Sequence, residues 1–349
     1  MKILMLGVYN IEDYSRGRVL YKGLKLNNVE TNIFTPKKNK YFQIIKRILK
    51  KDFDFLIVTG KIVLFYSWLL KPIHRKKIIF DVFISDYENL VIDRKIIKEK
   101  SMKSKLLKFI DKMSCKLADH CILDTQEHIS YFCSEFKLKN KKFSVVYVGA
   151  DDEIFYPKED IKKDKFIVEF HGTFIPLQGV EYIVKAAKIL EKENIQFKII
   201  GSGQEHKKIK ELYKDLKLNN IEFTDKNISL EELAKEINKA NICLGIFGES
   251  IKTNNVIPNK AFETIATKKP LITSETKAIK EIFIDKENCL LCKPHNEKDL
   301  ADKILILKND NKLREKIANN SYKKFKDKLD NKNIGKEVTK ILGSFYNSK

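Results

Sequence analysis

The chain has 349 residues, 43% of them hydrophobic, and a formal net charge of +21 at pH 7. This length favours two domains of ordinary size. The longest apolar stretch, residues 62–70, is too short to cross a bilayer, and a polar segment follows the first apolar run at once. We therefore expect neither a membrane span nor a signal peptide, and a cytoplasmic protein.

In the first part of the chain, short apolar runs alternate with polar or amphipathic segments. The runs that we expect to be strands cover residues 3–6, 31–34, 55–58, 78–80, 121–123 and 144–148. This alternation is typical of an α/β domain in which helices cover both faces of a parallel sheet. Residues 150–164 lack periodicity and contain Pro157, so we place an interdomain linker there.

Two segments of the first part are strongly basic. Residues 37–51 carry seven basic and no acidic side chains, and residues 94–116 carry nine basic and two acidic ones, with apolar residues between them. Both resemble basic amphipathic helices, which can dock on anionic lipid. The alternative is a helix packed on its own sheet with its lysines outward. No DNA- or RNA-binding motif appears, so we expect no nucleic-acid partner.

The second part repeats the strand and helix alternation and ends in a helical tail from residue 298 on. Its expected strands cover residues 166–170, 197–200, 221–223, 242–247, 271–273 and 290–291. Gly201-Ser202-Gly203 lacks the third glycine of a dinucleotide fingerprint, which argues against a nicotinamide cofactor. We predict two Rossmann-like domains, 1–160 and 161–349, that face each other across a cleft and hold one substrate each.

The segment from Val256 to Glu263 is the most informative part of the chain. A loop turns at Pro258, which fits the first position of a helix. The free N–H groups of this helix start, together with Lys260, suit a diphosphate. Glu263, about one turn further on, can accept hydrogen bonds from sugar hydroxyls. The alternative is an ordinary helix start with a solvated lysine and glutamate.

In their order and spacing, four segments resemble the GT-B glycosyltransferases, most closely the family-4-like branch of group 1. These segments are residues 146–151, 171–179, 199–203 and 244–263. The resemblance implies that the second domain binds a nucleotide-sugar without a metal or other cofactor. It also implies that Glu263 bonds the ribose, that Gly201 and Gly203 lie near the nucleobase, and that Gly172 lets the backbone approach the diphosphate.

The chain departs from the family pattern at its expected charged positions. Asn255 stands where the first of two motif glutamates is usual, and Thr173 and Gln178 stand where the family's loop has an arginine and a lysine. The positive charge for the diphosphate must then come from elsewhere. We expect Lys252 and Lys260, which flank the proline turn, to supply it as catalytic residues, with His171 as a further candidate. Thr173, Asn255 and Pro258 are expected to contact the donor.

The first domain would hold the acceptor. Ser15 and Arg16 open a helix after the first strand, so they can face a phosphate or a sugar. Asp81 lies where a strand meets its loop and can orient the acceptor hydroxyl or act as a base. The alternative for Arg16 is a solvated arginine at a helix start. We expect His120 to be structural and the remaining histidines outside the motif to lie on the surface, namely His74, His128, His206 and His295.

We therefore predict a metal-independent, retaining glycosyltransferase of the hexosyltransferase type. It would act on a glycan or lipid-linked acceptor in cell-surface polysaccharide or glycan synthesis, peripherally on the inner face of the cell membrane. One alternative is a sugar-nucleotide epimerase, which needs catalytic carboxylates and a histidine in the cleft, and we find no such set in the sequence. Another is a non-catalytic protein that binds a nucleotide-sugar.

Overall fold

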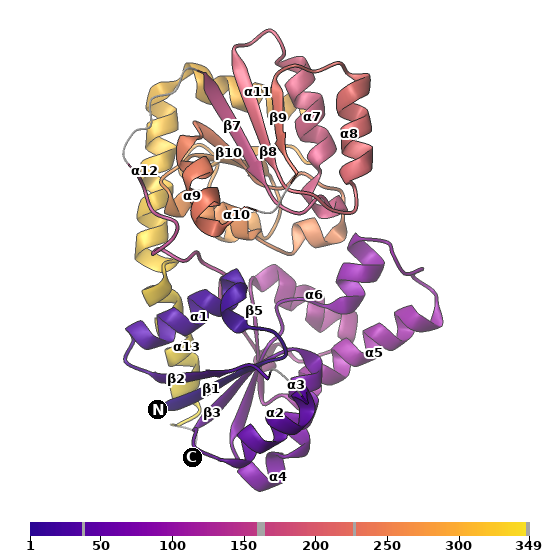
Figure 1. Ribbon diagram of the computed structural model, residues 1–349, viewed down its shortest axis with the longest axis vertical. Coiled ribbons are helices and arrows are strands. Elements are labelled where there is room, and N and C mark those ends of the chain that lie inside the picture. Colours follow the sequence, from indigo (N-terminus) through magenta and orange to yellow (C-terminus); the bar gives the residue numbers. More distant parts are fainter. Residues whose placement is uncertain (37–38, 159–164, 226–227, 347–349) are drawn as a thin grey trace. The chain divides into compact units, whose positions relative to one another are not determined.

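The computed structural model describes residues 1–36, 39–158, 165–225 and 228–346. The chain forms two compact units, one of residues 1–151 and 328–349 and the other of residues 152–327 (Figure 1). Each unit contains a six-stranded parallel sheet flanked by helices. Among the described residues, no helix is both long and apolar enough to span a membrane.

The sheet of the first unit has the strand order β2-β1-β3-β4-β5-β6. Its strands are β1 (Lys2–Gly7), β2 (Glu30–Phe34), β3 (Phe55–Thr59), β4 (Lys77–Asp81), β5 (His120–Leu123) and β6 (Phe143–Val145). β1 is apolar without alternation, and residues 3–6 have no exposed surface. A strand with this pattern is covered on both faces, as the expected parallel sheet requires.

Helices of the first unit follow most of its strands. They are α1 (Ser15–Leu26), α2 (Lys40–Leu49), α3 (Lys61–Leu69), α4 (Lys71–His74), α5 (Met102–Leu117), α6 (Gln126–Phe136) and α13 (Asn331–Ser344), with the short helices η1 (Ile11–Asp13), η2 (Glu88–Asp93) and η3 (Asn140–Lys142). The two basic segments largely form α2 and α5; Lys37 and Lys38 lie outside the described residues. Both helices bury one side and also leave large apolar residues outward, including Phe42 and Phe109.

The second unit repeats the design with the strand order β12-β11-β10-β7-β8-β9. Its strands are β7 (Phe166–His171), β8 (Ile195–Ile200), β9 (Ile221–Thr224), β10 (Ile242–Leu244), β11 (Leu271–Ser274) and β12 (Leu290–Cys292). Its helices are α7 (Val180–Ile189), α8 (His206–Asp215), α9 (Leu230–Lys239), α10 (Asn259–Ala266), α11 (Glu297–Asn309) and α12 (Asn311–Lys328), with the short helices η4 (Pro176–Gln178), η5 (Ile251–Asn254) and η6 (Ile279–Glu281).

The last helix, α13, belongs to the first unit, whereas we expected the whole tail to belong to the second. α13 packs against α1 (Figure 1). Glycines make this crossing close, because a Cβ atom on Gly335 would lie 2.0 Å from the carbonyl oxygen of Gly23. The apolar side of α13 also joins the core beneath β1 through Ile334, Val338 and Leu342.

The junction between the units falls at residues 151 and 152, inside the expected linker, part of which (159–164) lies outside the described residues. Asp151 is fully buried and anchors the junction to the first unit. Its carboxylate forms ion pairs with Arg18 at 3.0 Å and Lys22 at 2.9 Å, and accepts a hydrogen bond from Asn331 of α13 at 3.1 Å.

Candidate functional site

The carboxyl ends of β7 and β8 meet in a glycine-lined turn. Gly172, Gly201 and Gly203 have φ angles of 149°, 140° and 159°, which side chains rarely allow. A Cβ atom on Gly201 would lie 2.0 Å from the carbonyl oxygen of Gly172, and one on Gly203 would lie 2.7 Å from that of Phe174. The turn therefore brings three of the predicted donor-binding residues together. Thr173, also predicted, is exposed beside Gly203.

Lys260 reaches from the first turn of α10 into this glycine-lined turn. It is 3% exposed, and its Nζ donates a hydrogen bond to Oε1 of Gln178 at 2.5 Å. A Cβ atom on residue 172 would lie 2.8 Å from this Nζ, so the glycine leaves room for the lysine. In the described part of the chain, Lys260 forms no ion pair with a carboxylate. Burial lowers the pKa of Lys260 well below its usual value, although two nearby glutamates oppose the shift.

His171 is held between two carboxylates. Its Nδ1 lies 2.9 Å from Oε1 of Glu169, and its Nε2 lies 2.9 Å from Oε2 of Glu263. Burial disfavours the charged ring, but the two glutamates outweigh burial and raise the pKa of His171 to about 9. At neutral pH both ring nitrogens therefore carry protons and donate to the carboxylates. This contact holds the side chain of Glu263, the predicted ribose ligand, in one position.

The segment before α10 holds the other predicted donor residues. Lys252 lies in η5 and Asn255 follows it, and both are buried. No hydrogen bond or ion pair joins Lys252 to Lys260 or Glu263 in the regions that the structure describes. Pro258 is the N-cap of α10, one position earlier than expected, because its backbone is still extended (φ −69°, ψ 149°).

In the first unit, Arg16 and Asp81 form a buried ion pair. Nε of Arg16 lies 2.7 Å from Oδ1 of Asp81, and its Nη1 donates to the carbonyl oxygen of Val146 at 2.7 Å. The side chains are 2% and 3% exposed, so Arg16 is not a solvated residue. Burial raises the pKa of Asp81, and the charge of Arg16 opposes this shift.

Two buried polar atoms beside this ion pair have no hydrogen-bond partner among the described residues. They are Oγ of Ser15 and Nη2 of Arg16. Buried polar atoms are nearly always satisfied in folded proteins, so these two mark a place where a ligand or water is expected to bind. Ser15 and Arg16 were predicted to bind the acceptor, and Asp81 was predicted beside it. The structure brings all three to the start of α1 and the end of β4.

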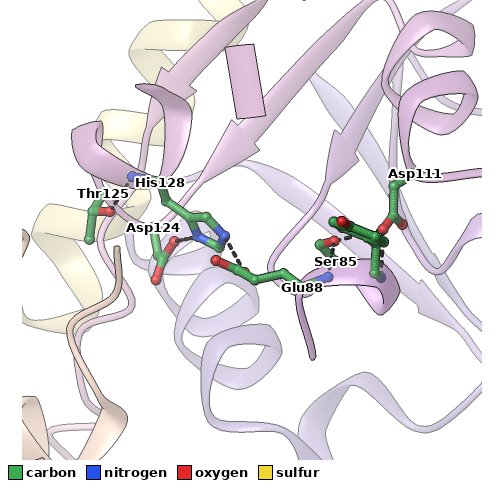
Figure 2. Close-up of polar contacts among 7 residues, drawn as sticks. Ser85, Glu88, Asp111, Asp124, Thr125 and His128 are labelled. Carbon is green, nitrogen blue, oxygen red and sulfur yellow. Dashed lines mark hydrogen bonds and ion pairs between the residues drawn. The ribbon is translucent and has the colours of Figure 1, made fainter. Parts of the chain in front are cut away.

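His128 on α6 forms a second buried ion-pair cluster in the first unit (Figure 2). Its Nδ1 lies 2.6 Å from Oδ1 of Asp124, and its Nε2 lies 3.0 Å from Oε2 of Glu88. The two carboxylates raise the pKa of His128 to about 10, against the effect of burial. The expectation that His128 lies on the surface is wrong, because a distant segment covers it.

The segment that covers His128 is fixed by a small hydrogen-bond network. Ser85 donates its hydroxyl to Oδ2 of Asp111 at 2.6 Å and accepts the N–H of Glu88 at 3.0 Å (Figure 2). His74 is also buried rather than exposed, and its ring contacts the carbonyl oxygen of Ser67. A single sequence gives no signal for such partners, because they come from other elements of the sheet.

Comparison with known proteins places the chain in a family. The family model described as Glycosyl transferases group 1 matches residues 151–324. An uncharacterized glycosyltransferase of Methanocaldococcus jannaschii is 31% identical over 199 residues, which are 55% of this chain and 50% of that protein. The chain thus spans half the length of this relative.

Two further proteins are similar over more of the chain. A Campylobacter jejuni enzyme, GalNAc-alpha-(1->4)-GalNAc-alpha-(1->3)-diNAcBac-PP-undecaprenol alpha-1,4-N-acetyl-D-galactosaminyltransferase, is 25% identical over 72% of this chain and 67% of its own. The crystal structure of Anabaena HepE in complex with UDP-glucose has a TM-score of 0.76 and 15% identity, covering 99% of this chain and 100% of that one. The chain belongs to the group 1 glycosyltransferases and has the GT-B fold of two Rossmann-like domains.

Proposed function

We propose that the protein transfers a sugar, of the hexosyl type, from a nucleotide-sugar to a glycan or lipid-linked acceptor in polysaccharide or glycan synthesis. The observation that carries the proposal is the position of Lys260. Its side-chain nitrogen donates a hydrogen bond to Gln178. Gln178 occupies the loop position at which the family usually has a lysine. The cation that the loop lacks therefore comes from the neighbouring helix.

Lys260 is suited to a diphosphate because no carboxylate neutralises it by direct contact in the described residues. A buried ammonium group is costly, and burial already lowers its pKa. A diphosphate bound beside Gly172 would favour the charged form and gain a strong charge-assisted hydrogen bond. Because negative charge grows on the diphosphate as the sugar leaves, this contact strengthens in the transition state.

The remaining donor contacts follow from the same cluster. Glu263, held by His171, would accept hydrogen bonds from the ribose hydroxyls. The glycine at 172 lets the Nζ of Lys260 lie against the turn, and the diphosphate and base would bind along the same turn, by Gly172 and Gly201. Asn255, Pro258 and Thr173 would line the rest, with Lys252 as a second, longer-range charge. Because Lys260 would supply the positive charge that stabilises the departing diphosphate, we propose that no metal is needed.

The first unit would bind the acceptor at Ser15, Arg16 and Asp81. In the transfer step, the acceptor hydroxyl oxygen bonds to the anomeric carbon and the bond from that carbon to the diphosphate oxygen breaks. The electron pair leaves with the diphosphate. In a retaining reaction, the hydroxyl proton passes to the departing diphosphate on the same face of the sugar, and Asp81 orients the hydroxyl. The Campylobacter relative, named for an undecaprenol-linked acceptor, supports a lipid-linked acceptor here.

A thermal-shift screen with UDP-, GDP-, ADP- and TDP-sugars tests the donor site. A ligand that binds only the folded protein raises the melting temperature. We expect one class of nucleotide-sugar to raise the melting temperature of the parent but not of Lys260→Met or Glu263→Gln. The control variant Lys277→Met changes an exposed lysine of the same unit and should respond like the parent. A shift that survives in the last two variants would contradict the donor site.

A sharper test moves the lysine from position 260 to position 178, where the family usually has it. The double variant Gln178→Lys, Lys260→Gln should recover part of the thermal shift that Lys260→Gln alone loses, because the two side chains already touch. With the donor identified, transfer should continue in EDTA, and NMR of the product should show the anomeric configuration of the donor. Loss of transfer in EDTA would contradict the metal-free mechanism.

One observation favours a second candidate, a sugar-nucleotide epimerase. Glu169, His171 and Glu263 form a cluster of carboxylates and a histidine, the set that such an enzyme needs. Incubation with a donor labelled in the sugar separates the two, because a transferase moves the label to an acceptor whereas an epimerase returns it in an isomeric nucleotide-sugar. A protein that binds without catalysis does neither.

A further inference from the structure

Helix α3 is apolar on the side that faces solvent. A helix that covers a sheet ordinarily turns polar residues outward. In α3 the buried positions are Val63, Leu64 and Ser67. The outward positions are also apolar and are 41% to 53% exposed: Ile62, Phe65, Trp68 and Leu69. Such a contiguous apolar surface is typical of an interaction site.

Helix α2 is a neighbour of α3 (Figure 1), and the apolar surface continues onto it through the exposed Tyr41. The ring of Tyr66 lies 5.5 Å from that of Tyr41, between centroids, and the ring of Phe65 lies 6.1 Å from that of Trp68. We call this surface the aromatic patch and define it by six residues: Tyr41, Ile62, Phe65, Tyr66, Trp68 and Leu69.

The surroundings of the aromatic patch are basic. Residues 55–80 contain five lysines and arginines and no aspartate or glutamate. Four of these cations line a hollow beside Trp68 and Leu69, and the acidic side chain of that hollow, Asp119, is already bonded to two of the lysines and to a backbone N–H. The other two, Arg75 and Lys76, form no ion pair among the described residues.

We propose that the aromatic patch and its basic surroundings bind an anionic lipid bilayer. Tryptophan and tyrosine favour the boundary between lipid head groups and acyl chains. Lysine and arginine beside them are attracted to the negative surface of anionic lipid, by about 1 kcal/mol each. A surface on which cations outnumber carboxylates around exposed aromatic rings matches a negatively charged, partly apolar partner. The bilayer would hold the unit that carries the proposed acceptor site, but the binding itself does not depend on the proposed reaction.

Trp68 is the only tryptophan in the chain, so its fluorescence reports on the aromatic patch alone. We expect its emission to shift to the blue when the protein meets phosphatidylglycerol–phosphatidylcholine vesicles, and to be quenched by brominated acyl chains. Added salt should reverse both effects, and pure phosphatidylcholine should give little response. No shift with the anionic vesicles would overturn the proposal. A shift that appears without lipid as the protein concentration rises would also overturn it, in favour of a second copy of the chain.

Paired variants distinguish binding through the aromatic patch from attraction by the overall positive charge of the chain. Phe65→Ser with Leu69→Ser should weaken vesicle cosedimentation strongly, whereas Ile189→Ser with Ile306→Ser, equally exposed residues of the second unit, should not. Arg75→Gln with Lys76→Gln should weaken binding about 30-fold.

The matched charge control is Lys207→Gln with Lys323→Gln, both highly exposed, which should have little effect. Melting temperatures close to that of the parent would show that each variant is folded. If both controls weaken binding as much as the patch variants, the charge acts without a specific surface and the proposal fails.

Discussion

The two units carry similar histidine–carboxylate clusters, but they differ in whether a nearby buried cation has a counter-ion. Each holds a buried histidine between two carboxylates, His171 in the second unit and His128 in the first. In the first unit the buried Arg16 is neutralised by Asp81 at 2.7 Å. In the second unit the buried Lys260 contacts a neutral amide instead. A neutralised cation stabilises the fold, whereas a cation without a counter-ion in the described residues is available for an anionic ligand.

The largest expected effect is the difference in folding stability between removing the counter-ion of Arg16 and removing Lys260 itself. Asp81→Ala leaves Arg16 buried without its counter-ion and should lower the free energy of unfolding by roughly 3–5 kcal/mol. Lys260→Met removes a buried group whose charged form is costly and should leave stability equal or higher, while donor binding is lost. Urea denaturation measures both. A large loss of stability in Lys260→Met would remove the contrast between the units.

The buried histidines should make stability fall as the pH rises. Both have a folded pKa above their usual value of 6.5, about 9 for His171 and about 10 for His128. Their stabilising contribution is therefore complete below pH 6.5 and lost as the pH rises through 9 to 10. We expect the melting temperature to decline over this window, and the decline to be shallower in His128→Gln and His171→Gln. An equally steep decline in both variants would assign it to other groups.

Donor binding should be coupled to proton uptake in the second unit. Burial lowers the pKa of Lys260 in the free protein, and a bound diphosphate would raise it again. Calorimetry in buffers of different ionisation enthalpy should show net uptake of protons near and above neutral pH, and affinity should fall as the pH rises. Lys260→Met should abolish the uptake. Binding without proton exchange would mean that Lys260 stays charged in the free protein.

The smallest expected effect is that of Ser15→Ala. Its Oγ is buried and has no hydrogen-bond partner among the described residues, so removing it should change stability by less than about 1 kcal/mol. If the acceptor uses this hydroxyl, KM for the acceptor should rise and KM for the donor should not. Thr264→Ala serves as the control in the second unit, because its Oγ1 is also buried and has no oxygen or nitrogen hydrogen-bond partner in the described ranges. An unchanged acceptor KM would remove Ser15 from the site.

The sequence predicted the repeated sheets well, because parallel strands buried on both faces appear as short apolar runs. It also predicted that Lys260 and Glu263 share the first turns of one helix, because their spacing is local information, and their role in donor binding stays a prediction. It did not predict that His128 meets Glu88 or that Arg16 meets Asp81, since each pair joins elements far apart in the chain. Nor did it predict the outward apolar side of α3. Apolar periodicity does not say which face of a helix the sheet will cover when both faces are apolar.

The return of α13 to the first unit has a consequence for biosynthesis. The core beneath β1 includes Ile334, Val338 and Leu342, which emerge from the ribosome after the whole second unit has been made. Domains usually fold in the order of their synthesis. Here the first unit keeps the apolar side of α1 exposed until α13 has been synthesised. The second unit, which is inserted into the first, can therefore fold before the first unit is complete.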